Sequence, residues 1–410
     1  MKNITQLNVA IILGGKKIDV GELISNNRKI YFKHYPNFIK TGFQISPFKM
    51  PLSTGILSTD VTVFDGLFGV FYDSLPDGWG RLLLDKALIE RGQSLSKIGP
   101  LDRLSLVGRN GMGALIYEPI INSEYNFKKQ LELDGIAQET QKVLEGISTD
   151  IIEELVQLGG SSGGARPKIF VGYHREKDHL IHGKGNLPEG YEHWIIKFSS
   201  STDPIDMAEI EYAYYKMALD SGLEMSECRL FKGVSGNQYF GTKRFDRKDN
   251  QRIHTHSAAG LMHDNFRLSN MDYGHIMDAT FRLENHIGAY KKVLQLAAFN
   301  IFGHNRDDHS KNISFLMNHI GEWQLAPAYD LTFSFSSHGF HSTTIAGEGR
   351  SPGSSHLTEL ANSFAVKNVK EIIEQVKEVT NNWKYYAKES GVSKTSLQLI
   401  DKTLTNLKND

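Results

Sequence analysis

The chain of 410 residues contains a single cysteine, Cys228. One thiol cannot form an intramolecular disulfide, and it cannot supply the several cysteine ligands that a cysteine-based zinc site requires. A chain that makes no internal disulfide suits a reducing compartment. This absence therefore excludes a disulfide-stapled scaffold and favours an intracellular protein.

Long apolar runs are also missing. The first apolar stretch, Val9 to Leu13, is too short for the core of a signal peptide and is not followed by a small-residue cleavage pattern. No run of about 18 apolar residues occurs, so we predict no transmembrane helix. These two absences predict a cytoplasmic protein without a membrane partner.

An excess of charge of either sign is lacking as well. The chain has 46 Lys and Arg residues against 47 Asp and Glu residues, which gives a formal net charge of -1. This balance provides no global attraction for nucleic acid or for an anionic membrane. A role on nucleic acid would need a local basic patch or a partner protein. The length allows two or three domains with at least one large apolar core.

The order of local patterns predicts an α+β fold. Residues 1–120 form a small mixed domain, with strand-like runs at Val9 to Leu13 and Ile30 to Phe32 and a turn at 76–78 before a helix. Residues 121–158 form a connecting segment that ends in an amphipathic helix. We expect a strand-rich small lobe at 159–250 and a mainly helical large lobe at 251–410. Within the large lobe, residues 366–410 are expected to hold two amphipathic helices.

A glycine-rich segment runs from Gly159 to Lys168 and leads directly into a strand pattern. Glycines can present backbone N–H groups to phosphate oxygens at close range, and Arg166 and Lys168 add positive charge. The segment does not match the Walker A pattern, because Ala165 follows Gly164, and it lacks the G-x-G-x-x-G spacing. A flexible linker is the alternative, but the strand that follows immediately argues against it.

Lys197 is the only charged residue in the apolar strand pattern HWIIKF. A buried lysine requires an anionic partner. That partner could be a nucleotide phosphate or a carboxylate such as Glu211 on the next helix. Alternatively, Lys197 lies at the end of its strand and reaches solvent.

The densest cluster of polar residues lies at 300–312, before another strand pattern. Asp307 precedes Asn312 by five residues, which is the arrangement of a kinase catalytic loop. In such a loop the carboxylate orients and deprotonates the attacking hydroxyl, and the asparagine binds Mg²⁺. Lys311 can neutralise charge on the transferred phosphoryl group. Asp330, in the following LAPAYDL segment, suits a second Mg²⁺ ligand.

Two other interpretations of this cluster are possible. His304, Asp307, Asp308 and His309 could bind a transition metal in a hydrolase, or the segment could be a polar surface loop. The order along the chain favours a kinase over both: a glycine-rich loop, a strand lysine, a helix glutamate, the Asp-x4-Asn pair and a final aspartate.

These motifs resemble those of HipA-like serine/threonine protein kinases, the toxins of type II toxin–antitoxin systems. The matching segments in the second domain are GGSSGGARPK, IIKF, KRFDR, DDHSKN and LAPAYDL. The first domain is similar through FDGLFGVFYDSLPDGWGR and GRNGMGAL. The resemblance covers nearly the whole chain and implies an N-terminal HipA-like domain followed by a bilobal kinase domain.

The resemblance implies Mg²⁺-dependent transfer of the ATP γ-phosphate to serine or threonine. Asp307 would be the catalytic base, Asn312 and Asp330 the Mg²⁺ ligands, and Lys197 a phosphate ligand. The hinge beside adenine would be the strand from Lys243 to Phe245, where a lysine replaces the expected acidic residue. The remaining ATP contacts would come from the glycine-rich loop: Ser161, Ser162, Gly163, Gly164, Ala165 and Lys168.

The family also implies regulation and partners. Ser161, with Ser162 as the alternative, would be autophosphorylated, and this would inactivate the enzyme, because a phosphate adds about -1.5 to -2 charges and would compete with ATP in the same loop. A helix-turn-helix antitoxin would make most of the contacts to operator DNA, and the protein substrate would be an aminoacyl-tRNA synthetase of a bacterial cell. Two rivals remain: a small-molecule kinase and a catalytically silent module that binds a repressor. Three histidines after the hinge, at 254, 256 and 263, are interpreted as packing or surface residues.

Overall fold

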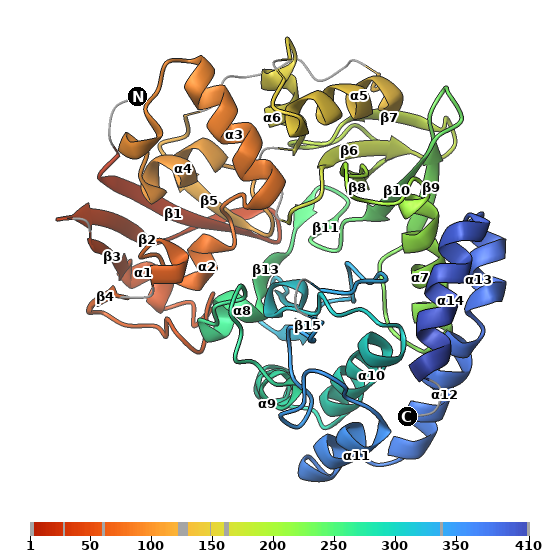
Figure 1. Ribbon diagram of the computed structural model, residues 1–410. Helices are drawn as coiled ribbons and strands as arrows, with labels where there is room; N and C mark the ends of the chain where they lie inside the picture. Colours follow the sequence, from red (N-terminus) through yellow and green to blue (C-terminus); the bar gives the residue numbers. More distant parts are fainter. Residues whose placement is uncertain are drawn as a thin grey trace.

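The computed structural model describes residues 4–27, 29–59, 62–121, 130–147, 149–159, 164–336 and 339–407. Three parts surround a common centre (Figure 1): an N-terminal domain, a small lobe built on a sheet, and a helical lobe. In the described part of the chain, no helix is long and apolar enough to cross a membrane.

The N-terminal domain contains an antiparallel sheet of five strands in the order β4-β3-β2-β1-β5. Its strands are β1 (Gln6–Leu13), β2 (Lys16–Asn26), β3 (Lys29–His34), β4 (Ile56–Ser58) and β5 (Leu115–Glu118). Alternate side chains of β1 point into the core, as expected for a strand with one covered face. The predicted strands at Val9 to Leu13 and Ile30 to Phe32 are confirmed.

Four helices and two 3-10 turns complete this domain. They are α1 (Pro36–Ile39), α2 (Gly69–Tyr72), α3 (Gly78–Glu90) and α4 (Pro100–Val107), with the turns at Thr62–Phe64 and Leu95–Lys97. The helix predicted after the turn at 76–78 is α3. Its buried side chains, among them Trp79 and Leu83, face the second domain and join a core cluster there.

The predicted connecting segment contains two helices, α5 (Leu133–Leu144) and α6 (Ile152–Gly159). The amphipathic helix predicted at its end is α6, and Leu155 and Leu158 on its apolar face are fully buried. Both helices lie over the small-lobe sheet (Figure 1). Their side chains pack with Trp79 of α3 and with Ile169 and Trp194 of the sheet in one core cluster. This shared core fastens the N-terminal domain to the small lobe.

The small lobe is an antiparallel sheet in the order β7-β6-β8-β10-β9 with one long helix. The elements are β6 (Lys168–His174), β7 (His179–His182), β8 (Tyr191–Lys197), α7 (Met207–Asp220), β9 (Cys228–Lys232) and β10 (Gln238–Lys243). The predicted strands and helix are all present. However, β10 ends at Lys243, so the chain has left the sheet before Phe245.

Beyond the small lobe the chain is mainly helical, as predicted. Short strands β11 (Arg247–Lys248) and β12 (Gln251–Arg252) precede a three-stranded sheet of β13 (His254–Ser257), β14 (Ser314–Met317) and β15 (Trp323–Leu325). The helices are α8 (Ala258–Met262), α9 (Tyr273–Glu284), α10 (Gly288–Phe302), α11 (Ser354–Ser363), α12 (Val369–Asn381), α13 (Trp383–Ser390) and α14 (Lys394–Asn406).

The prediction of two helices in residues 366–410 is wrong, because three are present: α12, α13 and α14. Gly391 has φ +84° and ends α13 in the left-handed conformation that glycine adopts at low cost. Asn382 separates α12 from α13. The apolar pattern alone did not reveal these two breaks.

A cluster of charges after β10 attaches the N-terminal domain to the hinge region. Asp246 is fully buried and accepts hydrogen bonds from Arg244 at 2.7 and 2.8 Å, from Arg247 at 2.6 Å and from the Gly113 amide at 2.8 Å. Arg247 and Arg252 also donate to backbone carbonyls of the loop at 109–113. Although burial raises the pKa of Asp246, Arg244 and Arg247 lower it overall, so its carboxylate is ionised.

We expect Asp246→Asn to lower the free energy of unfolding by about 3 to 5 kcal/mol, because two buried guanidinium groups lose their counter-charge. Denaturant unfolding of the full chain measures this change. The matched control is Asp249→Asn, at an exposed residue with φ +53° where asparagine is tolerated. That variant should stay within about 0.5 kcal/mol of the wild type. Equal stability of both variants would contradict a role for Asp246 in domain attachment.

Candidate active site

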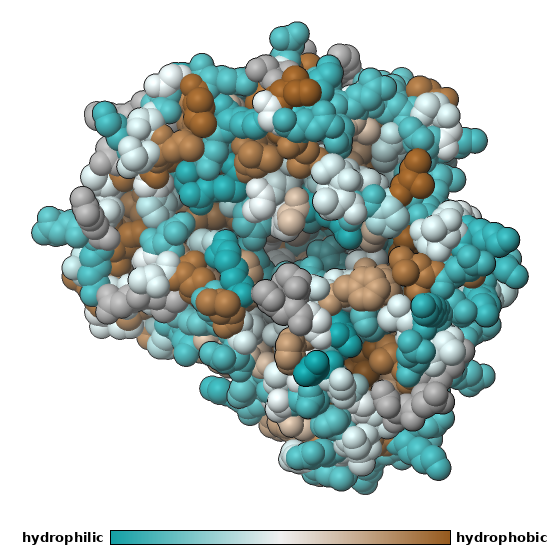
Figure 2. Space-filling view, viewed as in Figure 1, coloured by the Kyte–Doolittle hydropathy of each residue, from teal (hydrophilic) through white to brown (hydrophobic). Residues whose placement is uncertain are grey.

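A cavity of about 580 Å³ lies where the N-terminal domain, the small lobe and the helical lobe meet. The face shown in Figure 2 is hollowed near its centre. Nearly all the described residues that the sequence predicted for the site line this cavity: Gly164, Ala165, Lys168, Lys197, Lys243, Phe245, Asp307, Lys311, Asn312 and Asp330. Ser161, Ser162 and Gly163 lie outside the described residues.

Lys197 joins three elements at the floor of the cavity. Its Nζ lies 2.7 Å from Glu211 Oε2 on α7 and forms a second ion pair with Asp330 Oδ1, which follows β15. Glu211 is thus the carboxylate partner that the sequence suggested. Burial by itself lowers the pKa of Lys197, but Asp330 and Glu211 raise it overall. Burial raises the pKa of Asp330, and Lys197 and then Lys168 bring it well below its usual range. Lys197 and Asp330 are therefore both charged at neutral pH.

The two cations of the glycine-rich segment differ in their pairing. Arg166 lies 2.9 Å from Asp203 and 3.0 Å from Glu211, so its charge is balanced within the protein. Lys168 lies opposite Lys197 across the β6–β8 ladder and is 8% exposed. Among the described residues, no carboxylate lies within 4 Å of its Nζ. Burial lowers the pKa of Lys168. Lys168 thus faces the cavity without a carboxylate of the described ranges in contact with its ammonium group.

The segment between α10 and β14 forms a loop on the opposite wall. Asp308 anchors it, because this buried carboxylate accepts from Tyr273 at 3.1 Å, from the Ser342 amide at 2.8 Å and bonds His341 at 3.0 Å. Asn312 donates its side-chain amide to the Asp307 carbonyl at 2.9 Å. Its Oδ1 is then the atom left to bind a cation.

Asp307 itself keeps 62% of its side chain exposed and lies 3.8 Å from His309. Its pKa is raised above the usual range, first by partial desolvation at the cavity wall and then by the charges of Asp330 and Asp308, while His309 opposes the shift. A carboxylate that is accessible and more basic than usual is suited to accept a proton.

The predicted hinge lines the opposite end of the cavity. Lys243 pairs with Glu192 at 2.5 Å, so its side chain points to a protein carboxylate. The amides of Lys243 and Arg244 already donate to backbone carbonyls at 2.8 and 2.9 Å. The Phe245 amide has no acceptor among the described residues, and its ring lies 5.4 Å from that of Tyr329. Of the three amides of the predicted hinge, the Phe245 amide is therefore the one left to donate to a base.

Sequence reasoning missed the third wall of the cavity, which the N-terminal domain supplies. Its residues there are Asp73, Leu75, Asp77, Gly78 and Met112. Lys311, predicted to act on a phosphoryl group, forms an ion pair with Asp77. The sequence signals for this wall were the turn residues Pro-Asp-Gly and the glycines around Met112. Neither signal indicates which distant residues these segments contact.

The transition-metal interpretation of the loop is not supported by the geometry. His304 stacks on Phe333 at 5.2 Å between ring centroids, and Asp308 is used as the loop anchor. Within the described ranges, no group of three or more His, Cys, Asp or Glu residues could hold a metal ion.

The histidines after the hinge are packing residues, as predicted, at least at 254 and 256, which are buried. His256 bonds Asp73 at 2.7 Å and Ser46 at 3.1 Å, an order of groups that resembles a hydrolase triad. However, Ser46 is 0% exposed, so no substrate could reach it. The chain Ser46–His256–Asp73 instead ties the N-terminal domain to β13.

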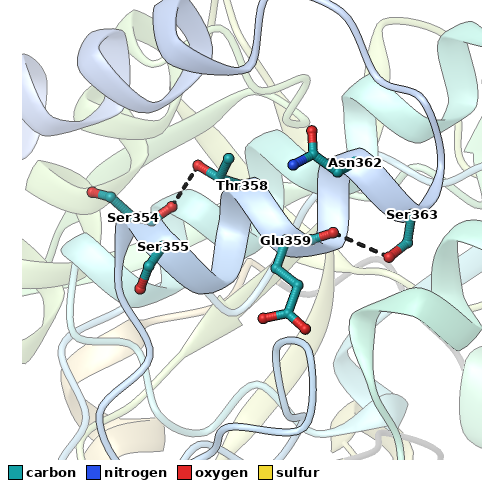
Figure 3. Close-up of a pocket in the computed structure, with 6 residues that line it drawn as sticks. All are labelled: Ser354, Ser355, Thr358, Glu359, Asn362 and Ser363. Carbon is teal, nitrogen blue, oxygen red and sulfur yellow. Dashed lines mark hydrogen bonds between the residues drawn. The ribbon is translucent and has the colours of Figure 1, made fainter.

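A second depression follows one face of α11 (Figure 3). It is lined by Ser354, Ser355, Thr358, Glu359, Asn362 and Ser363. Thr358 and Ser363 donate to backbone carbonyls of their own helix, at 2.8 and 3.1 Å. The hydroxyls of Thr358 and Ser363 therefore bond to carbonyls of α11 and do not converge on a ligand.

The sequence matches the HipA-like C-terminal domain over residues 160–383 and the HipA N-terminal domain over residues 10–118. No curated protein matches the chain.

The structure is similar to that of HipA from Shewanella oneidensis MR-1, solved with HipB and operator DNA. The TM-score is 0.70 at 16% identity, covering 98% of this chain and 96% of that chain. A Helicobacter pylori proinflammatory kinase, CtkA, matches with a TM-score of 0.36 at 12% identity, over 55% of this chain and 91% of that one. The predicted fold class, a mixed domain followed by a HipA-like bilobal domain, is confirmed.

We expect Mg-ATP to stabilise the wild type against heat and Lys168→Met to lose most of that stabilisation, because the variant lacks the cavity lysine that has no carboxylate of the described residues in contact with it. Without nucleotide, the variant should be as stable as the wild type or about 1 kcal/mol more stable, since a buried charge has been replaced by an apolar chain. Thermal unfolding with and without Mg-ATP measures both effects.

The control is Lys184→Met, which alters a desolvated lysine outside the cavity that donates to the Val156 carbonyl at 3.2 Å. It should keep the full nucleotide effect. If Lys168→Met is stabilised as much as the wild type, the cavity does not bind phosphate through this lysine.

Proposed function

The chain belongs to the HipA-like family, and on that premise we propose that it is a toxin-type kinase that transfers the ATP γ-phosphate to serine or threonine of a protein. The observation that carries this proposal is the charge arrangement of the cavity. The Lys168 and Lys197 ammonium groups lie on one wall, and the carboxylates of Asp307 and Asp330 line the same space. Cations suited to phosphates thus adjoin oxygen ligands suited to a divalent metal.

The available ligands fit Mg²⁺, which prefers a few protein oxygens together with phosphates and water. Asn312 offers Oδ1, because its amide nitrogen is held by the loop carbonyl. Asp330 pairs with Lys197 through Oδ1, which leaves Oδ2 for a metal. Bound between these oxygens, the ion would neutralise charge on the phosphates.

The chain's own groups then account for phosphoryl transfer. Asp307 orients the acceptor hydroxyl and takes its proton as the new oxygen–phosphorus bond forms and the bond to the ADP leaving group breaks. Lys197 and Lys168 hold the phosphates, and Lys311 compensates charge on the transferred group. The Phe245 amide offers a hydrogen bond to adenine at the hinge.

We extend four further properties of the family to this chain as part of the proposal. Ser161, or its neighbour Ser162, is the autophosphorylation site, four or fewer residues from Ala165 in the glycine-rich loop. A helix-turn-helix antitoxin neutralises the protein and provides most of the contact to operator DNA, which agrees with the net charge of -1. An aminoacyl-tRNA synthetase is the substrate class, and the cytoplasm of a bacterium is the compartment.

The two rival functions make different demands on the same cavity. A silent repressor-binding module does not need the Lys197–Glu211–Asp330 arrangement, which is intact here. A small-molecule kinase would use the same nucleotide site and would consume ATP without labelling protein. Incubation with Mg-ATP followed by mass spectrometry distinguishes the protein kinase, the small-molecule kinase and the silent module.

We expect Asp307→Asn and Asp330→Asn to lower phosphoryl transfer at least ~1000-fold, because one removes the base and the other a metal ligand. Intact-mass and peptide mass spectrometry after incubation with Mg-ATP measures the phosphate and its position. Wild-type protein should carry phosphate at Ser161 or Ser162.

Asp249→Asn, at an exposed turn residue, should label at the wild-type rate and is the control. Labelling of Asp307→Asn at that rate would refute the assignment. ATP consumption without labelled protein would favour the small-molecule kinase, and absence of ATP binding would favour the silent module.

The raised pKa of Asp307 predicts the acid limb of the pH profile. The base must be ionised, so the rate falls as the pH drops through this pKa, which lies above the ordinary aspartate value of about 3.9. Initial rates of self-labelling between about pH 4 and pH 8 measure the limb. A rate that does not change until the protein unfolds would contradict a titrating base at this position.

A further inference from the structure

The N-terminal domain reaches the reacting end of the cavity through the turn before α3. Asp77 accepts two short hydrogen bonds there: one carboxylate oxygen from the Gly164 amide and the other from the Lys311 ammonium group. The first donor belongs to the glycine-rich loop and the second to the catalytic loop. A single carboxylate from a different domain therefore joins the two loops that the proposed function places around the phosphates.

The backbone of this turn lies very close to the end of the glycine-rich loop. Gly78 has φ +42°, and a Cβ at this residue would lie 2.3 Å from the Gly164 carbonyl oxygen. The next residue, Trp79, donates its amide to the same oxygen at 3.0 Å, and its ring is buried in the core shared with α6 and the small-lobe sheet. The position of Asp77 is thus set by packing and by backbone contacts on both sides.

The charges at this junction are well shielded from solvent. The side chains of Asp77 and Lys311 are 12% and 14% exposed. Burial raises the pKa of Asp77, but Lys311, the Gly164 amide and Lys168 lower it overall, so the carboxylate is ionised. The Lys311 ammonium group also lies 5.2 Å from the ring centroid of Tyr72 and 4.9 Å from that of Phe266. Two of these three contacts to Lys311 come from the N-terminal domain.

We propose that Asp77 is a positioning residue of the active site, which holds Lys311 where it meets the transferred phosphoryl group and fixes the end of the glycine-rich loop. This inference rests on the proposed function. A lysine carries its charge on a flexible chain of four carbons, and a displacement of about 1 Å in a reacting group can cost ~100-fold in rate. The ion pair with Asp77 removes that freedom, so the N-terminal domain becomes a part of the catalytic apparatus.

The test compares full-length wild type with Asp77→Asn, in which the side-chain oxygen can still accept from Gly164 but the ion pair with Lys311 is lost. We expect kcat for self-labelling, or for phosphorylation of a generic peptide, to fall about 10- to 100-fold. The KM for ATP should change less than about threefold, because Lys168 and Lys197 still hold the phosphates.

Asp85→Asn is the matched control. Asp85 lies within α3, pairs with the buried Arg103 at 2.6 Å and does not line the cavity. This variant should lose thermal stability and keep its kcat. A loss of rate in Asp85→Asn as large as in Asp77→Asn would show a general effect of a weakened domain and would overturn the proposal.

Lys311→Met supplies the second measurement. If Asp77 acts through Lys311, the double variant with Asp77→Asn is no slower than Lys311→Met alone. A double variant that is a further 10-fold slower would overturn the proposal. An Asp77→Asn protein as fast as the wild type, or faster, would also overturn it. A faster variant would indicate that Asp77 inhibits the reaction by occupying Lys311. If the wild type itself transfers no phosphate, the proposed function fails first and this inference fails with it.

Discussion

The Lys197 ion pairs are the interaction on which the rest of the site depends. The ammonium group is held by Glu211 from α7 and by Asp330 from the segment after β15, so one side chain of the small lobe is tied to both the long helix and the helical lobe. Removing Lys197 would leave Asp330 without its ion-pair partner, and removing either carboxylate would leave the buried ammonium group with one partner instead of two. Both changes are costly in a protein interior. The pairs therefore join the two walls of the cavity, and the Lys197 charge keeps Asp330 ionised.

The N-terminal domain forms the third wall of the cavity. Both apolar and polar contacts attach this domain to the two lobes. Trp79 and α6 share a core with the small lobe, while Asp246, Arg247 and Arg252 hold the loop at 109–113. Farther along the cavity, Asp73 bonds the Ser257 amide and hydroxyl, each at 2.7 Å. These contacts are spread over both lobes. A movement of the N-terminal domain relative to either lobe would therefore break its contacts to that lobe. A cavity with three fixed walls follows from this arrangement.

Much of this architecture was predictable from the sequence. The sequence offered Glu211 as one possible partner of Lys197, and the structure pairs the two. The Asp-x4-Asn spacing predicted a loop, which the structure closes through the Asn312 side chain. The contacts that were not predictable join residues distant in sequence. Asp77 and Lys311 are separated by 234 positions, and neither periodicity nor turn chemistry encodes such a partner. Likewise, the boundaries of α12, α13 and α14 depend on local breaks that an apolar pattern of period 3.6 passes over.

The KRFDR segment has a structural role in addition to the hinge role that the sequence predicts for it. The sequence placed it at the nucleotide hinge, yet its charged side chains after Lys243 turn to one another and to the loop at 109–113. Lys243 is itself paired with Glu192. Hence no charged side chain of this segment is left free to select a base, and under the proposed function the Phe245 backbone and the shape of the pocket would recognise adenine. Under the proposed function, Lys168 and Lys197 give affinity for the phosphates that all nucleoside triphosphates share, and any discrimination between bases is left to the hinge end of the cavity.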